Sequence, residues 1–219
     1  MENQNLSIKQ IMITYGTLLG GISVAFQLML YFLDMHYKND STAGIVSLII
    51  MIGVLIYAFI QFKKQNEGYL SLSEALKIGL GISLVSALIG VVYTLILTNV
   101  LDPDTMQKSL EFTMDKVRAE NPEMPQEALD TTRSIQEKMS SPVILAAVQI
   151  IFALFFGFII SLIGGLIATG LAGVIAYYGT VLALRIGVDP DTYGIPLVTS
   201  TVDLAGAAGL VLAISWVGV

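Results

Sequence analysis

One apolar stretch in this chain is too long to cross a membrane only once. No charged side chain occurs after Pro142 until Arg185. As a helix this stretch would be roughly 65 Å long, about twice the thickness of the hydrocarbon core of a bilayer. We therefore expect two spans that fold back on each other, with a break where glycine frees the backbone. The glycines at that place are Gly164, Gly165, Gly170 and Gly173.

Four further apolar stretches have the length of a single membrane-spanning helix. They run from Ile11 to Leu33, from Ala43 to Phe62, from about Leu76 to Val100 and from about Pro196 to Val217. Because backbone polar groups in lipid must bond within their own segment, such runs are helices. We predict an all-α, polytopic integral membrane bundle of about six transmembrane helices. We expect it to be a multi-pass protein of the cell membrane that contacts the lipid bilayer.

Composition excludes several classes of function. Hydrophobic residues make up 55% of the chain and charged residues 13%, which argues against a disordered chain and against an ordinary soluble enzyme. The net charge of −6 argues against nucleic-acid binding, which needs a basic face. The chain has no cysteine and a single histidine, and we find no phosphate-binding loop or nucleophile motif. We therefore expect no enzymatic activity and no cofactor.

The polar stretch 101–141 is predicted to form a helical hairpin outside the membrane. Asp104 can cap the first helix, whose apolar face carries Met106, Leu110, Met114 and Val117. The second helix starts near Pro125 and ends before Pro142, with Ala128, Thr132, Ile135 and Met139 on one face. Three lysines between residues 63 and 77 indicate a cytoplasmic loop there, which places 101–141 on the opposite side of the membrane.

Several patterns in the first three-quarters of the chain occur in a fixed order. They are Tyr69–Gly79 before the third span, Asp102-Pro103-Asp104 after it, Ser141-Pro142 at the next span and Gly157–Ile163 near that span's end. With them, residues 1–165 resemble a family of small four-span membrane proteins known only as a domain of unknown function. The resemblance implies a fold and brings no activity. That family usually ends in a short basic tail, whereas this chain continues apolar.

The last quarter carries a different pattern. A proline follows Asp189 by seven residues, as Pro196, and a second aspartate follows after seven more, as Asp203. With the Thr-rich turn between them, this segment resembles the closing two helices of the MgtE-type magnesium transporters. The resemblance implies that Asp203 lines an ion pore at a dimer interface. We accordingly divide the chain into a four-span domain, 1–165, and a two-helix segment, 166–219, joined as a fusion or in an artificial chain.

Asp203 is the residue most indicative of function. It lies about two turns inside an apolar span, where a carboxylate is disfavoured by about 2.5–3.5 kcal/mol and usually faces a cavity or a partner. Mg²⁺ takes one or two carboxylates and keeps several waters, so a homodimer would present a suitable pair. Alternatively, Asp203 is protonated or hydrogen-bonded near the interface. Thr199, Ser200 and Thr201 are candidates for the pore lining, or they bond the carbonyls of their own helix. Asp189 and Asp191 are candidates for the pore mouth, or they cap the loop.

Other polar residues within or beside the spans have structural explanations. Gln27 and Gln149 lie mid-span and are expected to form interhelical hydrogen bonds, while Gly16 and Gly20 allow close helix packing. His36 stands two residues after Asp34, as an interfacial residue or a pH-sensitive pair. Three functions remain open: permeation of Mg²⁺ or another divalent cation past Asp203, a membrane scaffold that transports nothing, and a binding module whose acidic loop recruits a partner outside the membrane.

Overall fold

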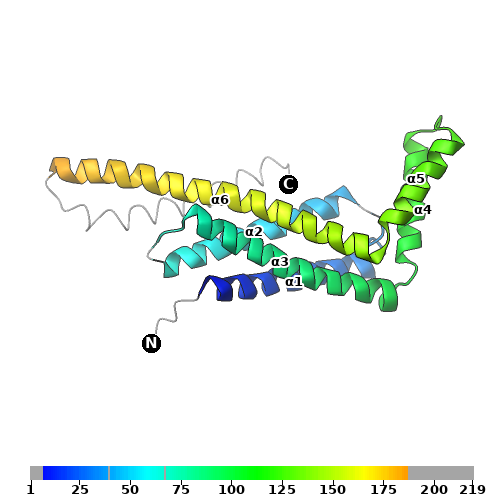
Figure 1. Ribbon diagram of the computed structural model, residues 1–219, viewed down its shortest axis with the longest axis horizontal. Helices are drawn as coiled ribbons and strands as arrows, with labels where there is room; N and C mark the ends of the chain where they lie inside the picture. Colours follow the sequence, from blue (N-terminus) through cyan, green and yellow to red (C-terminus); the bar gives the residue numbers. More distant parts are fainter. Residues whose placement is uncertain (1–6, 39, 67, 187–219) are drawn as a thin grey trace.

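The computed structural model describes residues 7–38, 40–66 and 68–186, and these residues form an all-α membrane-protein bundle. Its elements are α1 (Ile8–Phe32), α2 (Ser41–Gln65), α3 (Leu72–Ile96), the π-helical turn η1 (Leu97–Leu101), α4 (Thr105–Glu120), α5 (Gln126–Met139) and α6 (Pro142–Ile186). The spans lie side by side along the long axis, and α4 and α5 project at one end, called here the hairpin end (Figure 1). The predicted fold class is confirmed.

Four described helices are long and apolar enough to cross a membrane: α1, α2, α3 with η1, and the part of α6 from Pro142 to Gly170. Side-chain caps define where two of them begin. Ser7 and Ser71 each accept a hydrogen bond from the third backbone N–H of the helix, and Gln10 and Glu74 return a bond to the cap backbone. These capping boxes satisfy N–H groups that would otherwise lack partners at the helix start.

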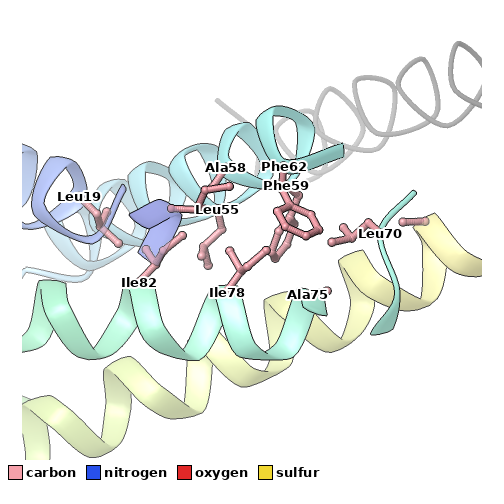
Figure 2. Packing of buried hydrophobic residues seen from close by; sticks show 11 residues of the cluster. Leu19, Leu55, Ala58, Phe59, Phe62, Leu70, Ala75, Ile78 and Ile82 are labelled. Carbon is pink, nitrogen blue, oxygen red and sulfur yellow. The ribbon is translucent and has the colours of Figure 1, made fainter. Parts of the chain in front are cut away.

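The central helix is α3, which packs against α1 on one side and α6 on the other. A hydrophobic cluster fills the end of the bundle opposite the hairpin. Figure 2 shows Leu55, Phe59 and Phe62 of α2 directed toward Ile78 and Ile82 of α3. Side chains this deeply buried are each worth roughly 1.5–3 kcal/mol in water, but in lipid the gain is close packing rather than escape from water.

Close packing of α3 against α6 depends on a reciprocal pair of small-residue motifs. Gly79 and Ser83 on α3 face Gly157 and Ser161 on α6, so that each serine lies where the opposite glycine has no side chain. A Cβ added at Gly79 would overlap Ser161, and one at Gly157 would overlap Ser83. Each serine hydroxyl donates to a carbonyl of its own helix, over 2.8 Å for Ser83 to Gly79 and 2.6 Å for Ser161 to Gly157. The contact therefore buries two hydroxyls with their hydrogen-bonding capacity used.

The prediction of a break within the long apolar stretch is wrong. α6 is one continuous helix of 45 residues, and it extends past the ends of the other spans (Figure 1). Gly164 and Gly165 lie against neighbouring helices instead of bending the chain: an added Cβ would come within 3.2 Å of Phe59 at Gly164 and within 2.9 Å of Ala75 at Gly165. Glycine costs about 1 kcal/mol in a helix, which is tolerated where it permits close packing in lipid.

The number of spans changes with that correction. The described residues provide four candidate spans, where the sequence predicted five up to Arg185. The sixth predicted span, from about Pro196 to Val217, lies outside the described residues. The boundary between 165 and 166 falls within α6 and stays a prediction.

The predicted helical hairpin is confirmed, but the buried face of α5 differs from the predicted one. α4 and α5 pack against each other through Leu110, Met114 and Leu129. On α5 the buried residue is Leu129, whereas Ile135 and Met139, assigned to the apolar face, are 55% and 45% exposed. The hairpin stands out from the end of the bundle (Figure 1).

Candidate functional site

Two helix ends bring polar residues together at the hairpin end. α1 finishes in a Schellman turn, in which the N–H of Met35 donates to the carbonyl of Leu30 over 2.9 Å and that of Asp34 donates to Tyr31 over 3.0 Å. Asp34 takes the left-handed conformation that this turn requires, with φ of 56°. Aspartate tolerates that conformation better than most residues do. The turn directs the chain toward α3 and sets the position of His36.

The end of α3 is the second of the two helix ends that bring polar residues together. The N–H of Asp102 donates to the carbonyl of Leu97 over 2.8 Å, which closes a π turn with one more residue than an α turn. Such turns occur frequently at functional sites. Pro103 follows, and a proline restricts the residue before it to extended conformations. The helix therefore stops with Asp102 buried between α1 and α4.

Asp102 is the centre of a cluster of polar side chains. Its Oδ2 lies 3.0 Å from His36 Nε2, and both of its oxygens accept hydrogen bonds of 2.9 Å from Lys108 Nζ. His36 Nε2 also lies 3.3 Å from the hydroxyl of Thr105. The side chain of His36 is only 2% exposed, and its ring packs against Tyr31 and Tyr37. We call His36, Asp102, Thr105 and Lys108 the hairpin-base cluster.

Electrostatics favour the charged form of the Asp102 carboxyl in this cluster. The hydrogen bonds from Lys108 lower the pKa of the Asp102 carboxyl to about 2, with smaller contributions from His36 and Thr105 against the opposing effect of burial. The same contact raises the pKa of Lys108. Asp102 is therefore ionised at neutral pH, and its charge is matched by the ammonium group of Lys108. A neutralised carboxylate offers little attraction to a passing cation.

The predicted pore residues are not tested by this geometry. Asp203, with Thr199, Ser200, Thr201, Asp189 and Asp191, lies outside the described residues. Within the described residues, no group of three or more histidine, aspartate or glutamate side chains could hold a metal ion.

The other polar predictions have mixed outcomes. Gln149 of α6 accepts a hydrogen bond from Thr94 of α3 over 3.3 Å, which confirms an interhelical bond. Gln27 has no side-chain hydrogen bond to any part of the chain that the structure describes. His36 pairs with Asp102, and Asp34 instead accepts a bond of 3.4 Å from Tyr37. Sequence reasoning used Asp102-Pro103-Asp104 only as one of the patterns of a family resemblance, because nothing local links Asp102 to a histidine 66 residues earlier.

The fold and the apolar spans define a helical integral membrane protein. Residues 14–169 match the family described as protein of unknown function (DUF4199), and the chain belongs to that family. Residues 130–213 match a second family, MgtE, described as divalent cation transporter. Both resemblances drawn from the sequence are thereby confirmed, although the transporter match begins within α5, well before residue 166. No curated protein and no solved structure matches the chain.

Proposed function

We propose that this protein carries Mg²⁺ or another divalent cation across the cell membrane, and that Asp203 is the carboxylate that faces the ion. The observation that carries the proposal is the match of residues 130–213 to a divalent cation transporter family. Asp189, Pro196 and Asp203 all lie within that match. The proposal assigns transport to the last quarter of the chain and a supporting role to the helical bundle.

The chemistry of the candidate residues suits a hydrated ion. Mg²⁺ binds few carboxylates and retains several waters, so one Asp203 from each chain of a homodimer would make a suitable pair. Hydroxyls of Thr199, Ser200 and Thr201 would accept contacts from the ion's water shell. Asp189 and Asp191 would raise the local concentration of cations at the pore mouth.

The described spans support this division because they contain almost no acidic side chains. Glu74 is the one acidic residue within the four described candidate spans, and it is engaged with Ser71 at the start of α3. Asp102, just beyond α3, is neutralised by Lys108. If a carboxylate faces the crossing cation, it comes from elsewhere in the chain, and the proposal assigns this role to Asp203.

A second candidate function is a membrane scaffold without transport. It is favoured by the longer of the two family matches, over residues 14–169, which brings no activity. In this alternative, Asp203 is a hydrogen-bonded residue near the interface, and the hairpin is a surface for other proteins.

Cation uptake by proteoliposomes distinguishes the two functions. Purified protein is reconstituted around a Mg²⁺-sensitive dye, and uptake is compared for the wild type, Asp203→Asn and Glu123→Gln. Glu123 is a matched control because its carboxylate is exposed on the hairpin and lies outside the residues that match the transporter family. We expect uptake above that of empty liposomes for the wild type and Glu123→Gln, and uptake close to that of empty liposomes for Asp203→Asn.

The proposal fails if wild-type uptake equals that of empty liposomes, or if Asp203→Asn transports as fast as the wild type. Loss of folding is checked separately by the helical circular dichroism and the melting temperature of each variant. Asparagine has nearly the size of aspartate, so a fold that depends only on packing at residue 203 should survive the substitution.

A further inference from the structure

A cavity of about 470 Å³ lies between α1, α3 and α6 where these helices approach the hairpin. Small-molecule sites usually measure about 300–1,000 Å³. The cavity reaches from Gln27, Gly90 and Gln149 within the spans to His36 and Thr105 at the hairpin base. It therefore runs from the base of the hairpin into the space between the spans.

Two buried polar atoms of residues that line this cavity have no hydrogen-bond partner within the described part of the chain. They are the hydroxyl of Tyr93, a residue that is 8% exposed, and Nδ1 of His36, whose side chain is 2% exposed. Buried polar groups are almost always paired, and leaving one unpaired is costly. Each such group needs a partner that the described side chains do not supply.

Two glutamines extend the same set of unused donors and acceptors. The carbonyl oxygen of Gln149 accepts from Thr94, while its NH₂ group has no partner among the described residues. Gln27 lines the cavity without a side-chain bond to any described residue. Gly90 makes room for this arrangement, because a Cβ there would overlap the amide nitrogen of Gln149. The absence of a side chain at Gly90 therefore sets the position of the Gln149 amide in the cavity wall.

The lining has hydrogen-bonding capacity but no free charge. Among the described residues around the cavity there is no aspartate, glutamate, lysine or arginine, and His36 already faces Asp102 through Nε2. An ion placed here would lose its water without gaining an opposite charge, so a charged ligand is disfavoured. Val24, Leu97 and Leu145 add apolar wall that suits C–H groups.

We propose that this cavity binds an uncharged, hydroxyl-rich molecule of about hexose size. The ring hydroxyls pair with the amides of Gln27 and Gln149 and, once its buried phenol turns into the cavity, with Tyr93, while the ring carbons contact the apolar side chains. Two sources supply this chemistry: a free polyol and the sugar headgroup of a glycolipid. The proposal uses none of the residues assigned to cation transport, so it stands or falls independently of that function.

Binding to the full chain in phosphatidylcholine nanodiscs tests the proposal. D-glucose is titrated by saturation-transfer NMR, with glucosamine and gluconate as cationic and anionic comparators. We expect glucose to bind, and both charged compounds to bind more weakly. In a second arm, monoglucosyl diacylglycerol is added to the nanodiscs: displacement of glucose at lower concentration identifies a glycolipid site, and its absence identifies a site for the free solute.

Tyr93→Phe separates binding from folding. It removes the unpartnered hydroxyl and keeps the ring, so we expect glucose binding to weaken about five- to tenfold while the melting temperature does not fall. Gly90→Val should abolish binding by displacing Gln149, and Tyr57→Phe, on an exposed part of α2, should leave binding unchanged. The proposal is overturned if neither glucose nor the glycolipid binds, if a charged comparator binds more tightly, or if Tyr93→Phe binds as well as the wild type.

Discussion

The interface between α3 and α6 has two halves that treat polar side chains in opposite ways. In the half away from the hairpin, Ser83 and Ser161 fill the space left by Gly157 and Gly79 and donate to their own helices. In the half near the hairpin, Tyr93 and Gln149 line a cavity and keep unused hydrogen-bonding groups. We call these the closed half and the open half.

The comparison teaches that polar residues within a membrane helix do not have one meaning. A serine four residues after a glycine satisfies its own hydroxyl and allows two backbones to approach, so it contributes to packing. A tyrosine or glutamine is too long to bond its own helix in that way. When such a residue faces a hollow, its polar end needs an outside partner, and the residue becomes a candidate for binding.

The largest change in stability is expected when a methyl group is added at Gly79 in the closed half. In Gly79→Ala the new Cβ would overlap the Ser161 hydroxyl on α6, and the helices must separate. Overpacking of this kind costs about 1–3 kcal/mol. We expect a clearly lower melting temperature in detergent, followed by helical circular dichroism.

Two further variants isolate the cause of that loss. Gly53→Ala in α2 adds the same methyl group where nothing lies within 4 Å, so it should be neutral or slightly stabilising. Ser161→Gly, combined with Gly79→Ala, removes the overlapping hydroxyl and should recover much of the stability. If Gly53→Ala is as harmful as Gly79→Ala, close packing at the closed half is not what stabilises this interface.

A smaller effect is expected at the hairpin-base cluster, which borders the open half. Asp102→Asn removes the ion pair with Lys108 and should lower the melting temperature at neutral pH. Because the carboxyl pKa falls from its ordinary 3.8 to about 2 on folding, this stabilisation is present above pH 3.8 and is lost as the pH falls through about 2. Melting of both proteins between pH 7 and pH 2 should therefore show a difference that shrinks at the acid end. A difference that stays constant with pH would assign the effect to packing.

The smallest effects are expected within the open half. Thr94→Val removes the bond to Gln149 and should destabilise the protein by about 1 kcal/mol. Tyr93→Phe removes a hydroxyl without a described partner and should leave stability unchanged or slightly higher. Chemical denaturation of the two variants side by side measures this contrast. Equal losses in both would mean that the Tyr93 hydroxyl is bonded, and the distinction between the halves would be lost.

Patterns local in sequence predicted much of this fold. Span positions, the hairpin from Thr105 to Met139 and the close approach at Gly16 follow from runs of apolar residues, breakers and small side chains. Gly164 and Gly165 misled the prediction, because glycine marks a helix break in some contexts and a close contact in others, while Gly170 and Gly173 continue the helix with open space around them. Only the position of the neighbouring helices, such as the contact of Gly165 with Ala75, separates the two meanings.

The polar sites were harder to foresee, because they depend on residues far apart in the chain. His36 meets Asp102 across 66 residues, and Thr94 meets Gln149 across 55. No spacing rule within one helix can reveal such pairs. The cavity is likewise a property of three helices and a hairpin together, and neither Tyr93 nor Gly90 stood out in the sequence.

Cation transport is the central proposal. It assigns the contact with the ion to Asp203 and not to Asp102. Mg²⁺ uptake by proteoliposomes should be measured in parallel for wild type, Asp203→Asn and Asp102→Asn. We predict that Asp203→Asn abolishes uptake while Asp102→Asn, whose carboxylate is already paired with Lys108, retains it. Uptake that survives Asp203→Asn, or that disappears only in Asp102→Asn, would contradict the account.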